Sequence, residues 1–564
     1  MLVRSALGVL SLAGLSQLVG GELSDTPSVA NFVRRATLRA TVLGNYVYFD
    51  GGEISQLEND KFNQGRASNQ VNSTLSIDIS KSWTNTDVAF NAIPKKLPTP
   101  TKTNQVLWTD AQNGAFYIFG GKWAHGENMA ETALWKFTTD GQGGGEWSLQ
   151  SPGNPSLFNG LVPSEQSVYV TVNDTGFAIG GIAHGWTQIR RLEGQAVAGM
   201  LGFNMTTKVW NNGTLGFSPI HTLSGGSAHH VPSFGPNGLV VLLGGESHPV
   251  DKLPVQGTGT YHDLRNLTFF DPQTKTTYWQ LATGDIPPHP RTGFCVTGFR
   301  DPEGGYEMFL FGGDNQRDKI SYQDAYVLSL PSFVWTRLPE PPAGPRAYHD
   351  CVSVGKRQVL SIGGTNRGWE DKDQAPQGLL LFDMTMMEWK DAYDAEADDY
   401  VRADLIKSRH NDGLEKMEWS SPEVQKLFQV SESTEGTPQP TSEPPASSAP
   451  VGAIVGGVVG GAAAITLVAV VVWWVLRRRR AKNEDAHDGD GAMETAEVGG
   501  ESKYLAEVAA THGHTELSTG YDGKTAQEED VQELESGYQT AELPSEQKAK
   551  GERAVFEMDA NPAK

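Results

Sequence analysis

The stretch MFLFGG at residues 308–313 is an apolar run that ends in two glycines, and the chain carries this pattern six times. The other copies are YVYFDGG at 46–52, FYIFGG at 116–121, FAIGG at 177–181, LVVLLGG at 239–245 and VLSIGG at 359–364. Successive copies lie about 50 to 70 residues apart, a period typical of proteins that stack one supersecondary unit per repeat. The glycine pairs are Gly51 and Gly52, Gly120 and Gly121, Gly180 and Gly181, Gly244 and Gly245, Gly312 and Gly313, and Gly363 and Gly364.

A tryptophan follows every glycine pair, about 20 to 35 residues further along the chain. These residues are Trp83, Trp147, Trp210, Trp279, Trp335 and Trp389. In all but the first repeat an aromatic residue comes shortly before the tryptophan, at Phe137, Phe203, Phe270, Tyr326 and Phe382. Because cross-strand aromatic pairs stabilise sheets, we expect each tryptophan to lie in the last strand of its repeat.

Each repeat reads as strand, turn, strand, loop, strand, turn, strand, which is the pattern of an antiparallel meander. Such a sheet cannot bury both faces alone, whereas several arranged radially can. The sequence therefore predicts an all-β fold, a β-propeller with six blades, or with seven if the termini pair with each other. Glycine tolerates a positive φ and close backbone approach, so we expect the pairs to form sharp bends beside neighbouring strands.

Two repeats open with Pro-Arg, at residues 290–291 and 345–346. Together with the glycine pairs and spaced aromatics, this pattern resembles the Kelch repeat over roughly residues 30–393. The layout is similar to fungal single-pass membrane Kelch-repeat proteins, within the galactose oxidase and Kelch-type propeller superfamily. The first repeat has only Arg34 and Arg35 near this opening, and repeats two to four lack the arginine.

The overall composition narrows the function classes. The formal net charge is -22, which argues against a general nucleic-acid binder because such proteins need a basic surface. The 64 glycines and 31 prolines are typical of a chain that is rich in turns. With only two cysteines, disulfides cannot be the main source of stability.

Two apolar segments predict the topology. Residues 1–21 read as a signal peptide, and residues 451–476 form an uncharged run long enough to span a bilayer. Four arginines follow at 477–480, which places the cytoplasm on that side. We therefore predict a type I protein of the plasma membrane or another secretory-pathway membrane. Small-residue spacings within the span are compatible with a helix dimer.

The remaining boundaries follow from composition. The extracellular propeller would comprise residues 22–430. Within it, residues 394–430 either pack under the blades or add a closing strand, and we favour packing. Residues 431–450 read as a Ser/Thr/Pro-rich stalk, and residues 477–564 as an acidic, disordered cytoplasmic tail that could recruit adaptors. Tyrosines of the tail, Tyr504, Tyr521 and Tyr538, are candidate phosphorylation sites.

Several residues are candidates for modification or chemistry. Glycosylation sequons occur at Asn72, Asn173, Asn204, Asn212 and Asn266, all in the propeller. Cys295 and Cys351 occupy similar places in adjacent first strands and either form a disulfide or remain buried thiols. Histidines are densest in repeat four, at His221, His229, His230, His248 and His262, with His289 nearby, but their spacing matches no metal motif.

Some Kelch-like propellers are copper radical oxidases, which need a Cys-linked tyrosine and imidazole ligands. Tyr348, His349 and the two cysteines are the residues here that bear on this alternative. A histidine at this point is ordinary in Kelch repeats, and we expect the chain to run from the propeller into a stalk instead of into the domain that supplies a further histidine in such oxidases. We therefore predict no enzyme activity, no catalytic or metal site and no cofactor.

The favoured function is that of a cell-surface binding or scaffold protein, similar to a receptor or an adhesion protein. Its ligand, a protein or a cell-wall glycan, would bind the loops at 53–74, 182–199, 246–266 and 365–377, because variable loops on a rigid scaffold suit recognition. The copper oxidase remains one alternative, and a structural cell-wall or polarity protein another.

Overall fold

The computed structural model describes residues 24–429, apart from 63–64, 125–131, 189–192 and 215–219. The predicted signal peptide, stalk, membrane span and tail lie outside the described residues. Within the part that is described, no helix is both long and apolar enough to cross a membrane.

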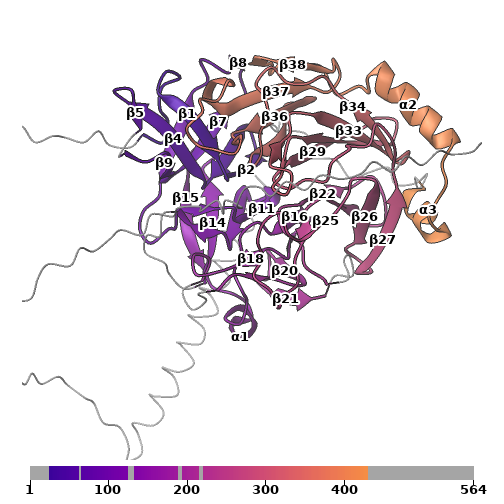
Figure 1. The fold of residues 1–564 in the computed structure, drawn as a ribbon, viewed down its shortest axis with the longest axis horizontal. Helices are drawn as coiled ribbons and strands as arrows, with labels where there is room; N and C mark the ends of the chain where they lie inside the picture. Colours follow the sequence, from indigo (N-terminus) through magenta and orange to yellow (C-terminus); the bar gives the residue numbers. More distant parts are fainter. Residues whose placement is uncertain (1–23, 63–64, 125–131, 189–192, 215–219, 430–564) are drawn as a thin grey trace, which may run out of the picture. The chain divides into compact units, whose positions relative to one another are not determined.

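Six antiparallel sheets, each built on four strands in chain order, follow one another round a centre (Figure 1). Blade one contains β2 (Arg39–Leu43), β3 (Tyr46–Asp50), β7 (Ser73–Asp78) and β9 (Phe90–Pro94). Blade two contains β11 (Val106–Asp110), β12 (Ala115–Phe119), β14 (Leu134–Thr139) and β15 (Gly145–Gln150). Blade three contains β16 (Val168–Val172), β17 (Thr175–Ile179), β20 (Met200–Asn204) and β21 (Trp210–Gly213).

The second half of the ring repeats this order. Blade four contains β22 (Ser227–Val231), β23 (Leu239–Leu243), β26 (Asn266–Asp271) and β27 (Thr276–Leu281). Blade five contains β29 (Cys295–Arg300), β30 (Tyr306–Phe311), β33 (Ala325–Leu330) and β34 (Val334–Arg337), with β28 (Thr283–Gly284) added in parallel to β34. Blade six contains β35 (Asp350–Val354), β36 (Gln358–Ile362), β37 (Leu379–Asp383) and β38 (Glu388–Lys390). Each repeat thus forms the four-stranded antiparallel meander that the sequence predicts.

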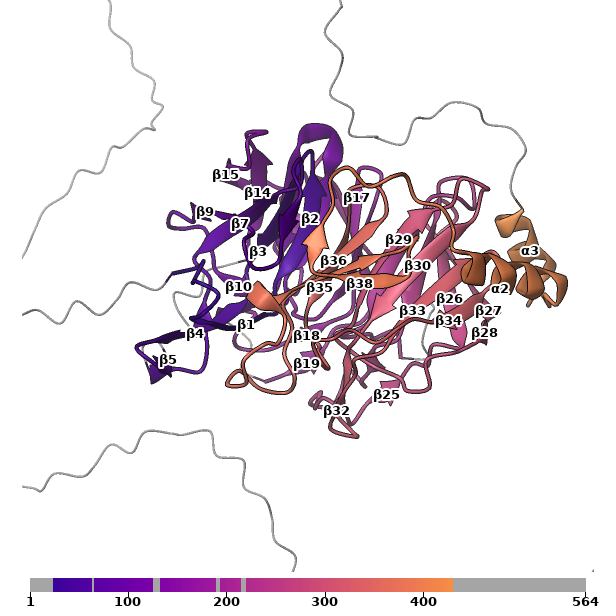
Figure 2. The same cartoon turned by 90° about the horizontal axis from the view of Figure 1, so that it is seen from above.

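Short strands build one face of the ring from the loops that follow the glycine pairs and, in β1 and β10, from the segments just before the first strands of blades one and two (Figure 2). They are β1 (Phe32–Ala36) with β4 (Glu53–Glu58), β5 (Lys61–Phe62) and β6 (Asn69–Gln70); β10 (Lys102–Thr103) with β13 (Lys122–Trp123); β18 (Ile182–Ala183) with β19 (Gln195–Ala196); β24 (Glu246–Ser247) with β25 (Thr260–Tyr261); and β31 (Asp314–Asn315) with β32 (Ile320–Ser321). We call this side of the propeller the loop face.

The glycine pairs connect each blade to the next. The amide of the second glycine donates to a backbone carbonyl of the following blade at 2.7–2.9 Å. The acceptors, in order from blade two round to blade one, are Lys102, Ser164, Leu223, Arg291, Arg346 and Arg35. At Gly51, where φ is +72°, an added Cβ would lie 2.3 Å from the Lys102 carbonyl oxygen. Glycine is therefore required by an inter-blade contact as well as by the bend.

A second ring of backbone hydrogen bonds surrounds the axis. One residue two positions before each first strand has φ between +51° and +66°, and its N–H donates to the carbonyl of its counterpart in the preceding blade at 2.7–3.2 Å. The members are Thr37, Asn104, Gln166, Gly225, Gly293 and Tyr348. Thr37 closes the ring by donating to Tyr348 at 2.7 Å. Six blades thus close the described propeller, and no seventh is inserted between blades six and one.

In blade one, Arg35 lies at the position that the arginines of the two Pro-Arg pairs, Arg291 and Arg346, occupy in blades five and six. The carbonyls of Arg35, Arg291 and Arg346 hold equivalent places in the glycine ring. Arg35 is fully buried, with its guanidinium 5.3–5.8 Å from the rings of Phe32, Phe49 and Phe90. The Pro-Arg pattern alone did not reveal this equivalence because Arg35 is preceded by another arginine instead of proline.

The hydrophobic core is divided among the blade interfaces. Separate clusters of buried residues lie between neighbouring blades, including one that joins blades six and one through Val47, Phe49, Leu360 and Leu381. This last cluster shows that the closure is packed as well as hydrogen-bonded.

Five of the six tryptophans lie in last strands, and one does not. Trp147, Trp210 and Trp389 pair across strands with the aromatic residues predicted for them. Trp279 lies in β27 but is 51% exposed. Trp83 lies in β8 (Trp83–Thr84), which pairs with β39 (Ala392–Tyr393), so the expectation that it belongs to the last strand of blade one is wrong. The last strand of that blade is β9, and Trp83 stacks on Tyr393 at the seam between the two ends of the ring.

Residues 394–429 pack beside the blades, as the sequence favoured. Helix α2 (Asp404–Glu415) contacts β33 and β34, and α3 (Pro422–Phe428) contacts β27. A closing strand also exists, but it is the two-residue β39, which comes before this segment. The other helical turns are α1 (Pro155–Phe158), η2 (Ala111–Asn113) and η4 (Pro376–Gly378).

Candidate functional site

A cavity of about 360 Å³ runs along the axis and is lined by the first strands of all six blades. Alternate side chains of a strand point to the same side, so each blade presents a few residues to it. Its polar lining includes Arg39, Thr41, Thr109, Tyr169, Ser227, His229, Thr297, Asp350 and Ser353. A concave site with several convergent polar groups is the usual form of a small-ligand site.

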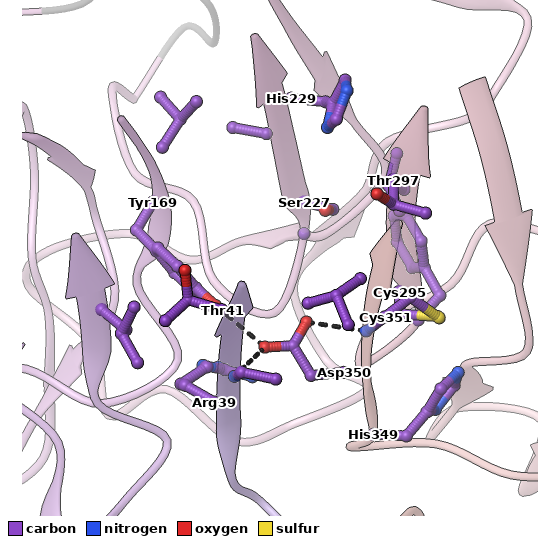
Figure 3. A pocket seen from close by; sticks show the side chains of 18 of the residues that line it. Arg39, Thr41, Tyr169, Ser227, His229, Cys295, Thr297, His349, Asp350 and Cys351 are labelled. Carbon is purple, nitrogen blue, oxygen red and sulfur yellow. Dashed lines mark hydrogen bonds between the residues drawn. A yellow bond between two sulfur atoms is a disulfide. The ribbon is translucent and has the colours of Figure 1, made fainter. Parts of the chain in front are cut away.

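Asp350 lies at the centre of the polar network in this cavity (Figure 3). Its carboxylate accepts hydrogen bonds from the Ala40 amide at 2.8 Å, the Cys351 amide at 3.0 Å and the Tyr169 hydroxyl at 3.2 Å. Burial raises the pKa of Asp350, and nearby Arg39 opposes that shift. The guanidinium of Arg39 lies 5.2 Å from the centre of the Tyr169 ring. One carboxylate therefore links residues of blades one, three and six.

Hydroxyl groups form a second set of polar contacts between blades. Thr41 and Thr109 share a hydrogen bond of 2.7 Å between blades one and two, and Thr297 and Ser353 share one of 2.8 Å between blades five and six. Hydroxyls can donate or accept, so such a wall can adapt to a ligand that carries both kinds of group.

The histidines of repeat four do not converge on one site. His229 and His230 line the cavity, where His229 shares a 2.7 Å hydrogen bond with the Tyr306 hydroxyl. Burial lowers the pKa of His229 to about 3, with a further contribution from His230, so its ring is neutral. His248 lies near Glu246 at 3.4 Å on the loop face, and His262 shares a hydrogen bond with Ser247. His289 instead stacks on Tyr322.

Cys295 and Cys351 form a disulfide between β29 and β35, with their Cα atoms 5.4 Å apart. The sequence left two alternatives, a disulfide or two buried thiols, and the structure contains the disulfide. The Tyr348 hydroxyl donates to Asp314 at 3.3 Å. Tyr348 and the two cysteines are thus engaged with other partners, neither cysteine is linked to a tyrosine, and His349 is buried without a hydrogen bond of ordinary geometry from its ring nitrogens to any residue that the structure describes.

The loop face carries exposed apolar side chains in two of the predicted binding loops. Trp186 in the loop at 182–199 is half exposed, as are Val250, Leu253 and Val255 in the loop at 246–266. An added Cβ at Gly194 would lie 2.9 Å from the Leu253 side chain, so the two loops are neighbours. These loops form part of the surface around the propeller axis.

The five sequons differ in accessibility. Asn72, Asn173, Asn212 and Asn266 are exposed. Asn204 is partly buried, its amide nitrogen donates to Asp174 at 2.7 Å, and its amide oxygen accepts from the Thr207 amide at 2.7 Å. Modification at Asn204 would have to break these contacts, so we expect it to be the least occupied of the five.

Sequence reasoning missed Arg39, Tyr169 and Asp350. None of them belongs to a motif, and they come together only because first strands from three blades meet at the axis. The usable signal was Asp350 itself, an acidic residue at the start of the apolar first strand DCVSV at 350–354.

Comparison with known proteins agrees with the architecture. No family model matches the chain. A Kelch repeat-containing protein of Arthroderma benhamiae is 21% identical over 438 residues, and the match covers 69% of this chain and 61% of the relative. This similarity and the all-strand ring support a Kelch-type β-propeller.

Proposed function

We propose that the chain is a cell-surface binding protein whose propeller recognises a neutral, hydroxyl-rich ligand, a glycan, in the axial cavity. The observation that carries the proposal is the polar lining described above, centred on Asp350 and Tyr169. Carboxylate and tyrosine groups can bind sugar hydroxyls, and the aromatic ring offers an apolar face. The acidic composition makes an anionic ligand less suitable than a neutral one.

The predicted signal peptide and membrane span would place this cavity outside the cell and the acidic tail in the cytoplasm, where adaptors would bind. That topology rests on the sequence, as does the prediction that the chain is not an enzyme. The Kelch-repeat similarity supports an interaction role in general terms, because propellers commonly bind through such surfaces.

Titration of the purified full-length chain with a panel of neutral oligosaccharides tests the proposal. For the oligosaccharide that binds best, Asp350→Asn and Tyr169→Phe should each weaken affinity about tenfold, the effect of losing one good polar contact, about 1.4 kcal/mol. Tyr278→Phe, which removes a hydroxyl from the outer strand β27, should leave affinity unchanged.

Two results would contradict the assignment. Unchanged affinity in both cavity variants would place the ligand elsewhere, and loss of binding only with Trp186→Ala would place it on the loop face. If no oligosaccharide binds and an unrelated folded domain can replace the propeller without a phenotype, the ectodomain acts as a spacer.

A further inference from the structure

A cluster of two sulfur atoms and one imidazole lies in the wall of the axial cavity. Cys295, Cys351 and His349 are all buried, and their potential ligand atoms lie within 4.8 Å of one another. Figure 3 shows the His349 ring on the same side of the strand as the two sulfurs. This is the one group of metal-type ligands that converges in this way within the described residues.

His349 is unusual because its polar atoms are nearly enclosed and poorly satisfied. The residue is 2% exposed, and neither ring nitrogen makes a hydrogen bond of ordinary geometry within the described structure. The His349 ring packs against the ring of Phe311, with the two ring centres 5.1 Å apart. A buried polar group without a full partner needs a physical reason.

We propose that, once the disulfide is reduced, Cys295, Cys351 and His349 form a binding site for Zn²⁺. Reduction adds two electrons and two protons to the disulfide and yields two thiols. A dithiol donor becomes a disulfide itself, and the phosphine used in the test takes an oxygen atom from water and becomes a phosphine oxide. Binding of Zn²⁺ then releases the two thiol protons, because thiolates are the ligands. The oxidised protein has no such site, because the two sulfur atoms are bonded to each other and neither is a thiolate.

The present positions suit this ligand set. Zn–S bonds of about 2.3 Å and Zn–N bonds of about 2.0–2.1 Å in a tetrahedral site separate the ligand atoms by about 3.5–3.8 Å. The ligand atoms now lie within 4.8 Å of one another, and the proposal requires the side chains to rotate once the sulfurs part, until the separations reach that range. Two thiolates neutralise the charge of Zn²⁺, so the loaded site adds no net charge beside the nearby Arg346. All three residues line the cavity, so water can supply the fourth ligand from that side.

The test measures Zn²⁺ binding by the purified full-length chain against a chromophoric chelator. After treatment with a phosphine reductant and removal of the excess, the chain should bind one Zn²⁺ at this site. The oxidised chain, and a reduced His349→Gln variant, should bind at least tenfold more weakly. A matched control, His230→Gln, changes another histidine of the same cavity and should bind as the wild type does.

Thermal unfolding separates a folded site from thiols in an unfolded chain. Added Zn²⁺ should raise the midpoint of the reduced wild type and not that of reduced His349→Gln, because only a site in the folded state stabilises it. Equal binding by the oxidised chain, equal binding by His349→Gln or no binding after reduction would overturn the proposal. Loss of the folded tryptophan fluorescence on reduction would also overturn it.

Discussion

At the scale of single residues, the propeller depends on backbone positions that admit few side chains. The second glycine of each pair donates across a blade interface, and the first approaches the neighbouring backbone closely. At Gly180, where φ is +62°, an added Cβ would lie 2.1 Å from the Leu223 carbonyl oxygen. Neither a rotamer change nor a flexible neighbour can relieve such a contact, because the opposing atom belongs to the backbone.

Gly180→Ala should therefore lower the free energy of unfolding by about 3 kcal/mol, combining left-handed strain with the clash. Gly44→Ala is the matched control. Gly44 has φ +59° but nothing within 4 Å of an added Cβ, so only the strain of about 1–2 kcal/mol applies. Denaturant unfolding of both variants measures the difference, and equal losses would show that the inter-blade contact contributes little.

A buried charge network ties the segment after blade six to blade five. Arg402 donates to Glu307 at 2.7 Å and pairs with Asp301 at 2.9 Å, while the Tyr400 hydroxyl donates to Glu307 at 3.2 Å. Burial raises the pKa of Glu307 from 4.5 to about 7, Arg402 opposes the shift, and Asp301 adds to it. Glu307 thus binds its proton more tightly in the folded chain than in the unfolded one.

This shift predicts a pH dependence of stability. The contribution from Glu307 is fully present below about pH 4.5 and is lost as the pH rises to about 7. Its size is up to about 3 kcal/mol, from 1.36 kcal/mol per pKa unit. In Glu307→Gln the fall in unfolding free energy between these pH values should be smaller than in the wild type, whereas the exposed Glu303→Gln should behave as the wild type. An unchanged slope in Glu307→Gln would refute the assignment.

At the scale of elements, much of the fold was predictable from the sequence. An apolar run that ends in two glycines dictates a buried strand and a bend, and six copies dictate six blades. The exceptions have physical causes. Trp83 pairs with Tyr393 at the seam between the two ends of the ring, and no local sequence pattern predicts that contact. In blade four the residue opposite Phe270 is Thr277, and Trp279 lies two positions further along the strand. Arg35 was hidden because its role comes from a contact with the last blade, far away in sequence.

Helix α3 is held mainly by aromatic packing. Phe428 of α3 is buried against Phe234, Phe269 and Phe333, with ring centres 4.9–5.2 Å apart. Phe428→Ala should reduce the free energy of unfolding by about 3 kcal/mol, as expected for a large cavity in a core. Leu405→Ala on α2, whose side chain is half exposed, should change it by less than about 0.5 kcal/mol. A small effect of Phe428→Ala in urea unfolding would mean that α3 detaches without disturbing the blades.

At the scale of the whole molecule, two rings of backbone hydrogen bonds and a packed seam close six blades around one cavity. This closure is what brings Arg39, Tyr169 and Asp350 together from the two ends and the middle of the repeat array. The sequence could predict the scaffold but not this constellation, since the inward-facing residues follow no common pattern among the blades. The loops expected to bind a ligand are present on one face, and the cavity between the first strands is the better-defined site.

Hydrogen–deuterium exchange of the full-length chain, with and without a saturating neutral oligosaccharide, tests the binding role of the cavity most directly. Binding there should slow amide exchange in the first strands that meet at Asp350, residues 39–43, 168–172 and 350–354, and leave the outer strands unchanged. Slower exchange confined to the loops at 182–199 and 246–266, or no change in any segment, would contradict the account.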